Sequence, residues 1–432
     1  MKLRRDLLHA ATVFSLLAQA QGPDLVGYWH NWNDASAPYI ELDQVDPRYT
    51  VIEVAFAEPA PGTTYDMQFV PSLTPPATFI AQVASLQAQG KKVLISMGGA
   101  NATVQLNADV ERDQFITSMV GILNTYGFDG LDIDLEGASV TNTGGTIAAP
   151  TTPSVIRLID AIGSIMAQYH AQNNRKMMLT MAPETAFVQG GMSAYGGIWG
   201  AYLPIIDALR DSLDILQVQL YNSGSMYGID GGIYNQGTAD FIVSQTEAVL
   251  QGFTTAGGTF AGLRPDQVAI GLPACTSAAG GGYVDTASVR AAAEYLLGSG
   301  PRPGSYNLQQ PNGYPDLRGL MTWSVNWDAA PACNGANSYA DTYEHIFGPL
   351  ATSIVDQGVA HALLIHPNPA NEQIILRLPV DQQNERVIIM DASGRIVTDR
   401  RVQGMLDVAM LPPGLYLLNL PELGLRSSFV KE

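Results

Sequence analysis

Positive charge is scarce in this 432-residue sequence, which has 22 Lys and Arg residues against 40 Asp and Glu residues and a formal net charge of −18. Proteins that bind nucleic acids or anionic membrane surfaces usually present clusters of basic side chains. The shortage of such residues therefore argues against both classes of partner. A neutral or cationic substrate suits an acidic chain of this kind better.

Metal-ligating residues are also few. The sequence has two cysteines, Cys275 and Cys333, which cannot make a zinc site alone, and its six histidines lack the spacing of metal ligands. We therefore expect no metal and no cofactor. Whether the two cysteines form a disulfide or remain separate buried thiols stays open at this stage, because an exported protein permits either.

Long hydrophobic runs are missing beyond the N-terminus, so we do not expect an integral membrane protein. The first residues are basic, an apolar run extends to Leu17, and Ala18-Gln19-Ala20 resembles a signal-peptidase cleavage site. We interpret residues 1–20 as a secretory signal peptide. An ordinary N-terminal helix is the alternative, because Asp6 and His9 interrupt the pattern.

Short β-rich apolar runs alternate with helical patterns over roughly the first 330 residues, which is typical of βα units around a parallel sheet. Eight such units predict an α/β fold of the (β/α)₈ TIM-barrel type, and an open doubly wound sheet is the alternative. The apolar runs span 25–32, 49–58, 91–99, 127–136, 177–184, 215–222, 268–274 and 319–327. The clearest helical patterns span 75–90, 110–127, 153–170 and 238–252.

Polar residues at the C-terminal ends of barrel strands are typically catalytic. Glu136, Glu184, Asn222 and Asn326 lie at or near the ends of four of the runs. A barrel would gather these side chains at one mouth, whereas an open sheet would leave the first and last strands without a shared site.

The composition changes after about residue 350, where β-patterned segments follow one another without a helical pattern between them. Turn residues at 392–394 and 412–414 separate these segments. We therefore divide the mature chain into a catalytic domain at 21–350, a linker at 351–360 and a small all-β sandwich at 361–432.

The segment GFDGLDIDLEG, residues 127–137, places carboxylates within an otherwise apolar strand pattern. Alternate residues of a strand share a face, so Asp132, Asp134 and Glu136 form a row with Cα atoms about 6.5 Å apart. Like charges raise one another's pKa, and Glu136 is expected to hold a proton near neutral pH, as a general acid requires. A solvated acidic face or a calcium loop is the alternative, but the glycine and ligand spacing of an EF-hand is absent.

Residues 129–136 resemble the D-G-x-D-x-D-x-E signature of glycoside hydrolase family 18, the chitinases and endo-β-N-acetylglucosaminidases. The resemblance extends over residues 25–328 and includes the loop at 271–283, which is similar to that of chitinase D-like bacterial members. The other matching segments are SMGG at 96–99, MAPE at 181–184, QLYN at 219–222 and MTWSVNWD at 321–328.

This resemblance implies a retaining, substrate-assisted mechanism in which the N-acetyl oxygen of the sugar attacks the anomeric carbon. It assigns general acid/base catalysis to Glu136 and stabilisation of the acetamido group to Asp134. Asp132 is expected to share a proton with Asp134, and Tyr221 to hydrogen-bond the acetamido carbonyl. These four residues are the catalytic candidates.

Substrate-binding residues also follow from the resemblance. Trp323 matches the tryptophan beneath the reacting sugar, and Asn222 stands where many members have aspartate. Trp29, Trp32 and Trp327 are equally compatible with sugar platforms and with the core. We expect Tyr28, Phe56, Met181, Glu184, Gln219, Asn222 and Trp323 to bind substrate, Ser96 to hydrogen-bond Asp132, and Asp129 to anchor the start of the strand.

The tail resembles the C-terminal sorting domain of the type IX secretion system. The matching features are the P-N-P-A opening at 367–370, the D-x-x-G-R turn at 391–395 and the L-P-x-G-x-Y strand at 411–416. The resemblance implies export through the periplasm of a Gram-negative bacterium, then release or attachment at the outer surface. A carbohydrate-binding module is the alternative, but Tyr416 and Phe429 are the only aromatic residues of the tail.

These observations predict a secreted, monomeric chitinase that hydrolyses β-1,4 bonds between N-acetylglucosamine units. Its expected partners are chitin or its oligosaccharides and the type IX secretion machinery. One alternative is an endo-β-N-acetylglucosaminidase acting on N-glycan cores. A second is a non-catalytic chitin-binding lectin on the same barrel, which the presence of Glu136 disfavours.

Overall fold

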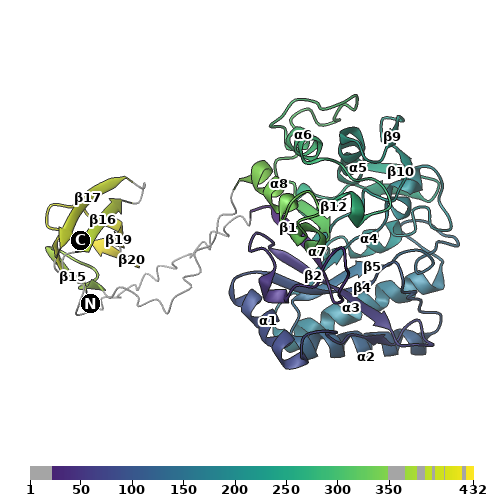
Figure 1. Ribbon diagram of the computed structural model, residues 1–432, viewed down its shortest axis with the longest axis horizontal. Helices are drawn as coiled ribbons and strands as arrows, with labels where there is room; N and C mark the ends of the chain where they lie inside the picture. The colour runs from purple at the N-terminus through teal and green to yellow at the C-terminus, as the bar shows by residue number, and fades with distance from the viewer. Residues whose placement is uncertain (1–21, 349–364, 377–384, 392–394, 403, 421–424) are drawn as a thin grey trace, which may run out of the picture. The chain divides into compact units, whose positions relative to one another are not determined.

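The computed structural model describes residues 22–348, 365–376, 385–391, 395–402, 404–420 and 425–432 (Figure 1). The expected signal peptide at 1–20 and the expected linker at 351–360 lie outside the described residues. The chain divides into two compact units, Met1–Ala351 and Thr352–Glu432.

The first unit is built on eight parallel strands that are hydrogen-bonded in the order β12-β13-β1-β2-β4-β5-β6-β7. Isolated parallel bridges pair Leu216 with Val268 and Gln219 with Gly271, so the two ends of this sheet meet and the barrel closes. The predicted TIM-barrel fold is confirmed. The strands are β1 (Asp24–His30), β2 (Val51–Pro59), β4 (Lys92–Gly98), β5 (Gly130–Asp134), β6 (Met178–Met181), β7 (Ile215–Leu216), β12 (Ala269–Pro273) and β13 (Gly319–Trp323).

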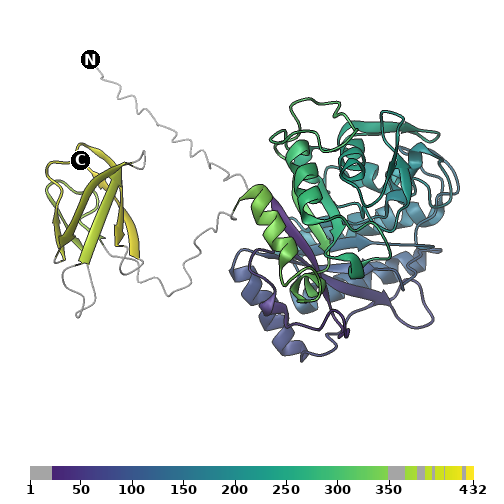
Figure 2. The same ribbon diagram turned by 45° about the horizontal axis from the view of Figure 1, so that its top comes forward.

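Helices surround these strands and cover their outer face (Figures 1 and 2). They are α1 (Pro76–Ala88), α2 (Asp109–Tyr126), α3 (Pro153–Asn173), α4 (Leu203–Leu209), α5 (Ala239–Gln251), α6 (Thr286–Leu296), α7 (Val325–Ala329) and α8 (Ser338–Phe347). Shorter strands lie in the connections: β3 (Met67–Gln68), β8 (Ser225–Tyr227), β9 (Ile233–Asn235), β10 (Gly252–Thr255) and β11 (Gly258–Ala261). The four helices predicted from sequence correspond to α1, α2, α3 and α5.

All eight strands are shorter than their predicted runs, and the runs at 215–222 and 319–327 differ in ways that matter for the site. The run at 215–222 has only two residues in β7, although Gln217 and Gln219 still donate backbone hydrogen bonds toward β6. The run at 319–327 ends at Trp323, because Ser324 caps α7 and turns the following residues into a helix. Asn326 therefore does not end a strand.

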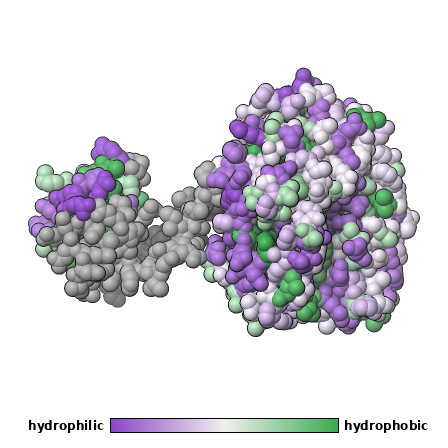
Figure 3. Space-filling view, viewed as in Figure 1, coloured by the Kyte–Doolittle hydropathy of each residue, from purple (hydrophilic) through white to green (hydrophobic). Residues whose placement is uncertain are grey.

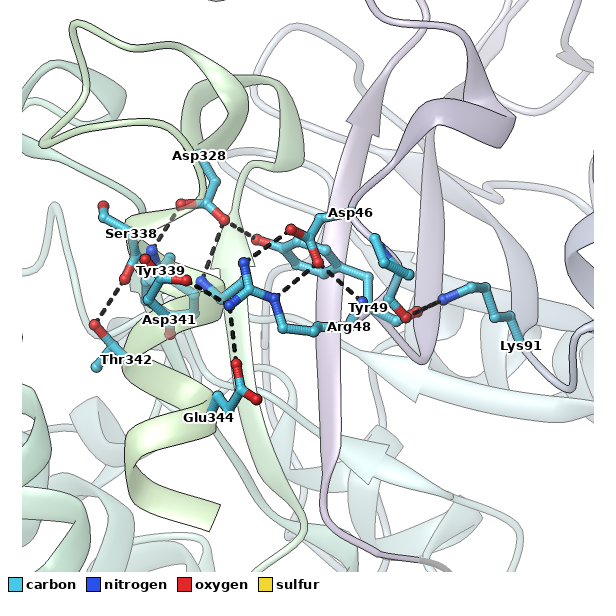
Figure 4. A network of polar contacts seen from close by, with 12 residues as sticks. Asp46, Arg48, Tyr49, Lys91, Asp328, Ser338, Tyr339, Asp341, Thr342 and Glu344 are labelled. Atoms are coloured by element: carbon cyan, nitrogen blue, oxygen red, sulfur yellow. Dashed lines mark hydrogen bonds and ion pairs between the residues drawn. The ribbon is translucent and has the colours of Figure 1, made fainter. Parts of the chain in front are cut away.

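The connection between β1 and β2 is tied to α7 and α8 by the polar network of Figure 4. The Arg48 guanidinium forms ion pairs with Asp46 at 2.8 Å and with Glu344 at 3.2 Å. The Tyr49 hydroxyl donates to Asp328 Oδ2 at 2.8 Å, and burial raises the pKa of Asp328 to about 6. These contacts join the first and last βα units around the barrel.

A disulfide joins Cys275 to Cys333, whose Cα atoms are 5.3 Å apart. This settles the alternative that the sequence left open. The bond connects the segment after β12 to the segment after α7, at the C-terminal side of two adjacent strands.

The carboxylate of Glu247, fully buried on α5, holds the long connection between α6 and β13. It accepts hydrogen bonds from the hydroxyls of Tyr306 and Tyr314, both at 2.6 Å, and from the backbone amide of Gln309 at 2.8 Å. Two hydroxyls and a backbone amide thus donate to one buried carboxylate. The cost of removing these donors from water is compensated only by their hydrogen bonds to that group.

Replacing Glu247 with glutamine should lower the free energy of unfolding by about 2–4 kcal/mol, because the amide turns an N–H group toward one of these donors. Denaturant unfolding followed by tryptophan fluorescence measures this, since all five tryptophans precede residue 328. Glu294→Gln removes a carboxylate that is paired with Arg290 near the surface and should cost less than about 1 kcal/mol. Equal effects of the two variants would contradict the anchoring role of Glu247.

The second unit consists of two antiparallel sheets with one apolar core between them. Ile374 and Leu406 from one sheet and Val387, Leu418 and Phe429 from the other are buried together in that core. This is the predicted β-sandwich. One sheet comprises β14 (Ile365–His366), β15 (Gln373–Leu376) and β18 (Met405–Asp407), and the other β17 (Ile396–Val402), β16 (Glu385–Asp391), β19 (Gly414–Leu420) and β20 (Leu425–Lys431).

The face of the barrel unit seen in Figure 3 is largely hydrophilic, and its hydrophobic residues are scattered rather than gathered. Among the described residues, no helix has both the length and the apolar character that crossing a membrane requires.

Candidate active site

Strand β5 carries the acidic residues on the face that points into the barrel. Asp132 and Asp134 are buried there, whereas Leu131 and Ile133 pack against the surrounding helices, as the alternation of a strand requires. Glu136 follows two residues beyond the strand and is partly exposed. We refer to Asp132, Asp134 and Glu136 as the carboxyl ladder.

Asp132 is the deepest member of the ladder and is surrounded by hydroxyl groups. Tyr28 and Ser96 donate to its Oδ2 at 2.7 and 2.6 Å, and the Thr180 hydroxyl lies 2.7 Å from its Oδ1. The predicted hydrogen bond from Ser96 is confirmed. Burial raises the pKa of Asp132, and the bonds from these hydroxyls oppose the rise.

Asp134 and Glu136 share one donor, the side-chain amide of Gln219, which lies 2.9 Å from Asp134 Oδ1 and 3.1 Å from Glu136 Oε1. Burial raises the pKa of Asp134 well above its usual range, and the charges of Glu136 and Asp132 add to this. Burial also raises the pKa of Glu136, while hydrogen bonds with Gln219 and Asp134 lower it. Desolvation is therefore the largest cause for Glu136, rather than the like charges that the sequence suggested.

Asp129 lies out of phase with the ladder. Its carboxylate accepts hydrogen bonds from Gln87 Nε2 at 2.9 Å and from the backbone amide of Val93 at 3.0 Å, and it forms an ion pair with Arg175. These partners belong to neighbouring elements, so Asp129 anchors the start of β5, as predicted.

A cavity of about 500 Å³ opens above the ladder. Its charged lining residues, Asp134, Glu136 and Glu58, are all acidic, and no Lys or Arg lines it within the described chain. Its aromatic lining residues are Tyr28, Trp32, Phe56, Tyr221 and Trp323, and its remaining polar side chains are Asn101, Gln219 and Asn222.

Three of the aromatic residues form a wall in which Phe56 stacks with both Trp32 and Trp323, while the two tryptophan rings are tilted by 36° to each other. The ring centroids of Phe56 and Trp323 are 5.8 Å apart with an interplanar angle of 12°, and those of Trp32 and Phe56 are 6.2 Å apart at 25°. His30 stacks against Trp32 at 4.4 Å, and burial lowers the pKa of His30 to about 4, so a neutral ring supports the wall. Flat apolar faces of this kind suit the hydrophobic face of a pyranose.

Tyr221 and Asn222 lie where the segment after β7 meets the loop after β12. The Asn222 side-chain oxygen accepts a hydrogen bond from the backbone amide of Gly281 at 3.1 Å. Gly282 has a φ of +95°, and a Cβ atom there would lie 2.7 Å from the Tyr221 Cα atom. Glycine at this position lets the loop approach closely and set the position of Tyr221.

The structure brings Tyr28, Phe56, Gln219, Asn222 and Trp323 to the cavity together with Asp134, Glu136 and Tyr221. Two other expected substrate-binding residues do not line it. Met181 is fully buried in the core outside the barrel, because Thr180 before it occupies the inward phase of β6. Glu184 is half-buried beside Glu136, whose charge adds to the effect of burial in raising the pKa of Glu184.

The remaining tryptophans differ from one another. Trp32 lines the cavity with 37% of its surface exposed, whereas Trp29 is fully buried in the outer core and donates to the backbone oxygen of Ile40. Trp327 packs beside the disulfide, outside the cavity lining. Asn326 is buried and accepts a hydrogen bond from the His30 backbone amide, so it supports β1 rather than facing the mouth.

Sequence reasoning missed Glu58, Asn101 and Ala278 in the lining, and Glu53 and Thr180 beneath the ladder. Glu58 ends the second predicted strand, so the rule applied to other strand ends would have identified it. The others carry no comparable signal. Within the described residues, no cluster of His, Cys, Asp and Glu is arranged to hold a metal ion.

Two family models match the chain. The model described as glycosyl hydrolases family 18 matches residues 24–307, and the model described as a secretion system C-terminal sorting domain matches residues 364–427. The first match covers more than half of the chain and the barrel strands from β1 to β12, including the carboxyl ladder.

Named relatives agree with the first match. Chitinase Chi52 of Paenibacillus xylanexedens is 50% identical over 310 residues, 71% of this chain and 58% of that protein. Chitinase D of Niallia circulans is 47% identical over 341 residues, 78% of this chain and 63% of that protein. The chain thus spans less than two thirds of the length of these two relatives.

The solved structure of a family GH18 chitinase from Chromobacterium violaceum superimposes with a TM-score of 0.67 and 38% sequence identity, over 77% of this chain and 84% of that one. The barrel, the ladder within it and these matches lead to one conclusion. The chain belongs to glycosyl hydrolase family 18.

Proposed function

We propose that the chain is a secreted chitinase that hydrolyses β-1,4 bonds between N-acetylglucosamine units with retention of the anomeric configuration. The observation that carries this proposal is the ladder itself: Gln219 bridges Asp134 and Glu136 in a cavity that is also lined by the stacked rings of Trp32, Phe56 and Trp323. The chitinase names of the relatives support the substrate class.

In the proposed mechanism, the sugar bound against Trp323 uses its own N-acetyl oxygen as the nucleophile. Glu136 donates its proton to the leaving oxygen as the glycosidic bond breaks, and an oxazolinium ion forms on the sugar. Glu136 then removes a proton from water, which attacks the anomeric carbon from the face that the leaving group vacated. The raised pKa of Glu136 supports its role as the acid in the first step.

Asp134 and Tyr221 are proposed to hold the acetamido group. Asp134 accepts a hydrogen bond from the acetamido N–H and stabilises the positive charge that develops there, while the Tyr221 hydroxyl donates to the carbonyl. Burial and the nearby carboxylates raise the pKa of Tyr221 well above its usual range, which keeps this phenol protonated as a donor. Asp132, which lies deeper in the barrel, shares a proton with Asp134.

Product analysis tests this function. The enzyme should release short N-acetylglucosamine oligosaccharides from colloidal chitin, and NMR should show the β-anomer first. An endo-β-N-acetylglucosaminidase would instead release glycans from a high-mannose glycoprotein and leave chitin intact. Binding of chitin oligosaccharides without hydrolysis would identify a lectin.

The alkaline limit of activity should move when Gln219 is replaced by leucine. Its hydrogen bonds hold down the pKa of both Asp134 and Glu136, so removing them raises both values and keeps Glu136 protonated to higher pH. The alkaline limb of the kcat/KM profile of Gln219→Leu is therefore expected at higher pH than that of the parent enzyme, although the maximum activity falls. An unmoved limb, or one at lower pH, would contradict this.

We further propose that residues 361–432 direct the enzyme across the outer membrane through the type IX machinery, after residues 1–20 direct it to the periplasm. The sorting-domain match supports this assignment. A reporter that carries residues 1–20 at its N-terminus and residues 361–432 at its C-terminus should reach the cell exterior in a bacterium with that system, and should remain periplasmic without the tail. Residues 21–350 are assigned to catalysis and residues 351–360 to the linker.

A further inference from the structure

A fourth carboxyl group lies beneath the ladder and has no part in the mechanism above. Glu53, on the inner face of β2, is fully buried and does not line the cavity. Its hydrogen-bond partners are uncharged: the Thr180 hydroxyl lies 2.8 Å from Oε1, and the Gln217 side-chain amide nitrogen lies 2.7 Å from each carboxyl oxygen. Burial raises the pKa of Glu53 well above its usual range, and the charge of Asp132 adds to this.

The Thr180 hydroxyl lies between two carboxyl groups, 2.8 Å from Glu53 Oε1 and 2.7 Å from Asp132 Oδ1. A hydroxyl has one hydrogen and can donate to only one of them. If both carboxyls were ionised, the second contact would bring two oxygen lone pairs together without a hydrogen between them. One of the two carboxyls must therefore carry a proton and donate it to Thr180.

The surroundings of the two carboxyls indicate which one is protonated. Asp132 Oδ2 accepts hydrogen bonds from Tyr28 and Ser96 in addition to the contact of Oδ1 with Thr180. Glu53 accepts from the amide of Gln217, and the Tyr28 hydroxyl, which also acts on Glu53, donates to Asp132 Oδ2 at 2.7 Å. Donors stabilise the ionised form of a carboxyl, so in the resting enzyme the charge lies on Asp132 and the proton on Glu53.

We propose that Glu53 is a positioning residue that exchanges this proton with Asp132 through the Thr180 hydroxyl. The Glu53 O–H bond breaks as its hydrogen passes to Thr180 Oγ1, and the hydrogen of Thr180 passes to Asp132 Oδ1. Asp132 becomes neutral, Glu53 becomes an anion and Thr180 is unchanged. No net charge enters or leaves the barrel interior.

The exchange would reduce the repulsion between negative charges at the step in which Glu136 loses its proton. On the proposed function, on which this inference rests, Glu136 becomes an anion when it protonates the leaving group, next to Asp134. Moving the negative charge from Asp132 down to Glu53 increases its distance from this new charge and reduces the repulsion. Glu53 thereby acts on the reaction through Asp132 and without contact with the sugar.

Glu53→Gln tests the exchange. The amide keeps the shape of the side chain and an N–H donor for Thr180, but it cannot release a proton at that position. We expect kcat on chitin oligosaccharides to fall at least tenfold with KM changed less than twofold. A kcat equal to that of the parent enzyme would overturn the inference, since it would reduce Glu53 to a fixed hydrogen-bond donor.

Two substitutions of Thr180, one without and one with a hydroxyl, test whether the relay depends on that hydroxyl. Thr180→Val has nearly the same shape without the hydroxyl and should lose kcat as Glu53→Gln does, whereas Thr180→Ser keeps the hydroxyl and should restore at least half of the parent kcat. Equal activities of the valine and serine variants would contradict the relay.

Infrared spectroscopy tests the position of the proton without substrate. The carbonyl-stretch region of protonated carboxyls should lose one component at neutral pH in Glu53→Gln, while the component of Glu136 remains and Glu294→Gln leaves the whole region unchanged. A difference spectrum between the parent enzyme and Glu53→Gln that lacks this component would overturn the inference. Because this measurement needs no turnover, it separates failure of the inference from failure of the proposed chitinase activity.

Discussion

Glu136→Gln should reduce the turnover of chitin oligosaccharides by roughly 10²- to 10⁴-fold, the range typical of a general acid, while their affinity stays within a few-fold of the parent value. The glutamine amide has the shape of the carboxyl and can still meet the Gln219 side chain, which lies 3.1 Å from Glu136 Oε1. What it lacks is a proton acidic enough to transfer to the leaving oxygen.

Chromatography of the products from a chitin pentasaccharide measures the turnover, and titration calorimetry measures the affinity. Glu294→Gln is the control for loss of a carboxylate, since this residue lies near the surface in an ion pair with Arg290. Glu294→Gln should keep the turnover and the affinity of the parent enzyme. Turnover by Glu136→Gln close to that of the parent enzyme would remove Glu136 from the chemistry, and a large loss of affinity would assign it to binding.

The face of each acid on β5 was predictable from sequence because it depends on strand phase alone. Asp132 and Asp134 alternate with Leu131 and Ile133, and the structure places the two pairs on opposite faces. Asp129, out of phase, forms structural contacts instead. The same rule argues against Met181, which was assigned to the cavity from its motif and lies outside the barrel.

The partners of the ladder were not predictable in this way, because they depend on how strands pair. Thr180 meets Asp132 because β5 and β6 pair with these two residues in register, and Glu53 comes from β2, two strands away from β5 in the sheet. No local pattern in the sequence specifies that register. The disulfide between Cys275 and Cys333 is similar, since its ends approach only when β12 and β13 lie side by side.

A helix cap that follows a strand directly also limits the prediction of where the strand ends. Ser324 accepts a hydrogen bond from the Trp327 backbone amide and starts α7, so Asn326 moves from an expected strand end into a helix that packs beside β1. An apolar run alone does not distinguish a strand from a strand followed by a capped helix. Trp323 keeps its predicted place because it precedes this cap.

Asp134→Asn should lower kcat by roughly 10²-fold or more, with a smaller effect on KM. Asp134 is the buried member of the ladder nearest to Glu136, and Gln219 bonds to both. Asparagine keeps its size but not its charge, so the positive charge that develops on the acetamido group during oxazolinium formation loses its counter-ion. A charge that exists mainly in the transition state affects kcat more than substrate binding.

Asp129→Asn is the matched control on the same segment, since the two aspartates are five residues apart but belong to opposite phases. Asp129 contacts Val93 and Arg175 rather than the cavity, so its replacement should lower the unfolding temperature and leave kcat of the folded enzyme unchanged. Asp134→Asn should instead lower kcat and leave the unfolding temperature unchanged. If both variants lost stability and activity in parallel, the charge of Asp134 would be serving the fold of β5, and the acetamido group would have to be stabilised elsewhere.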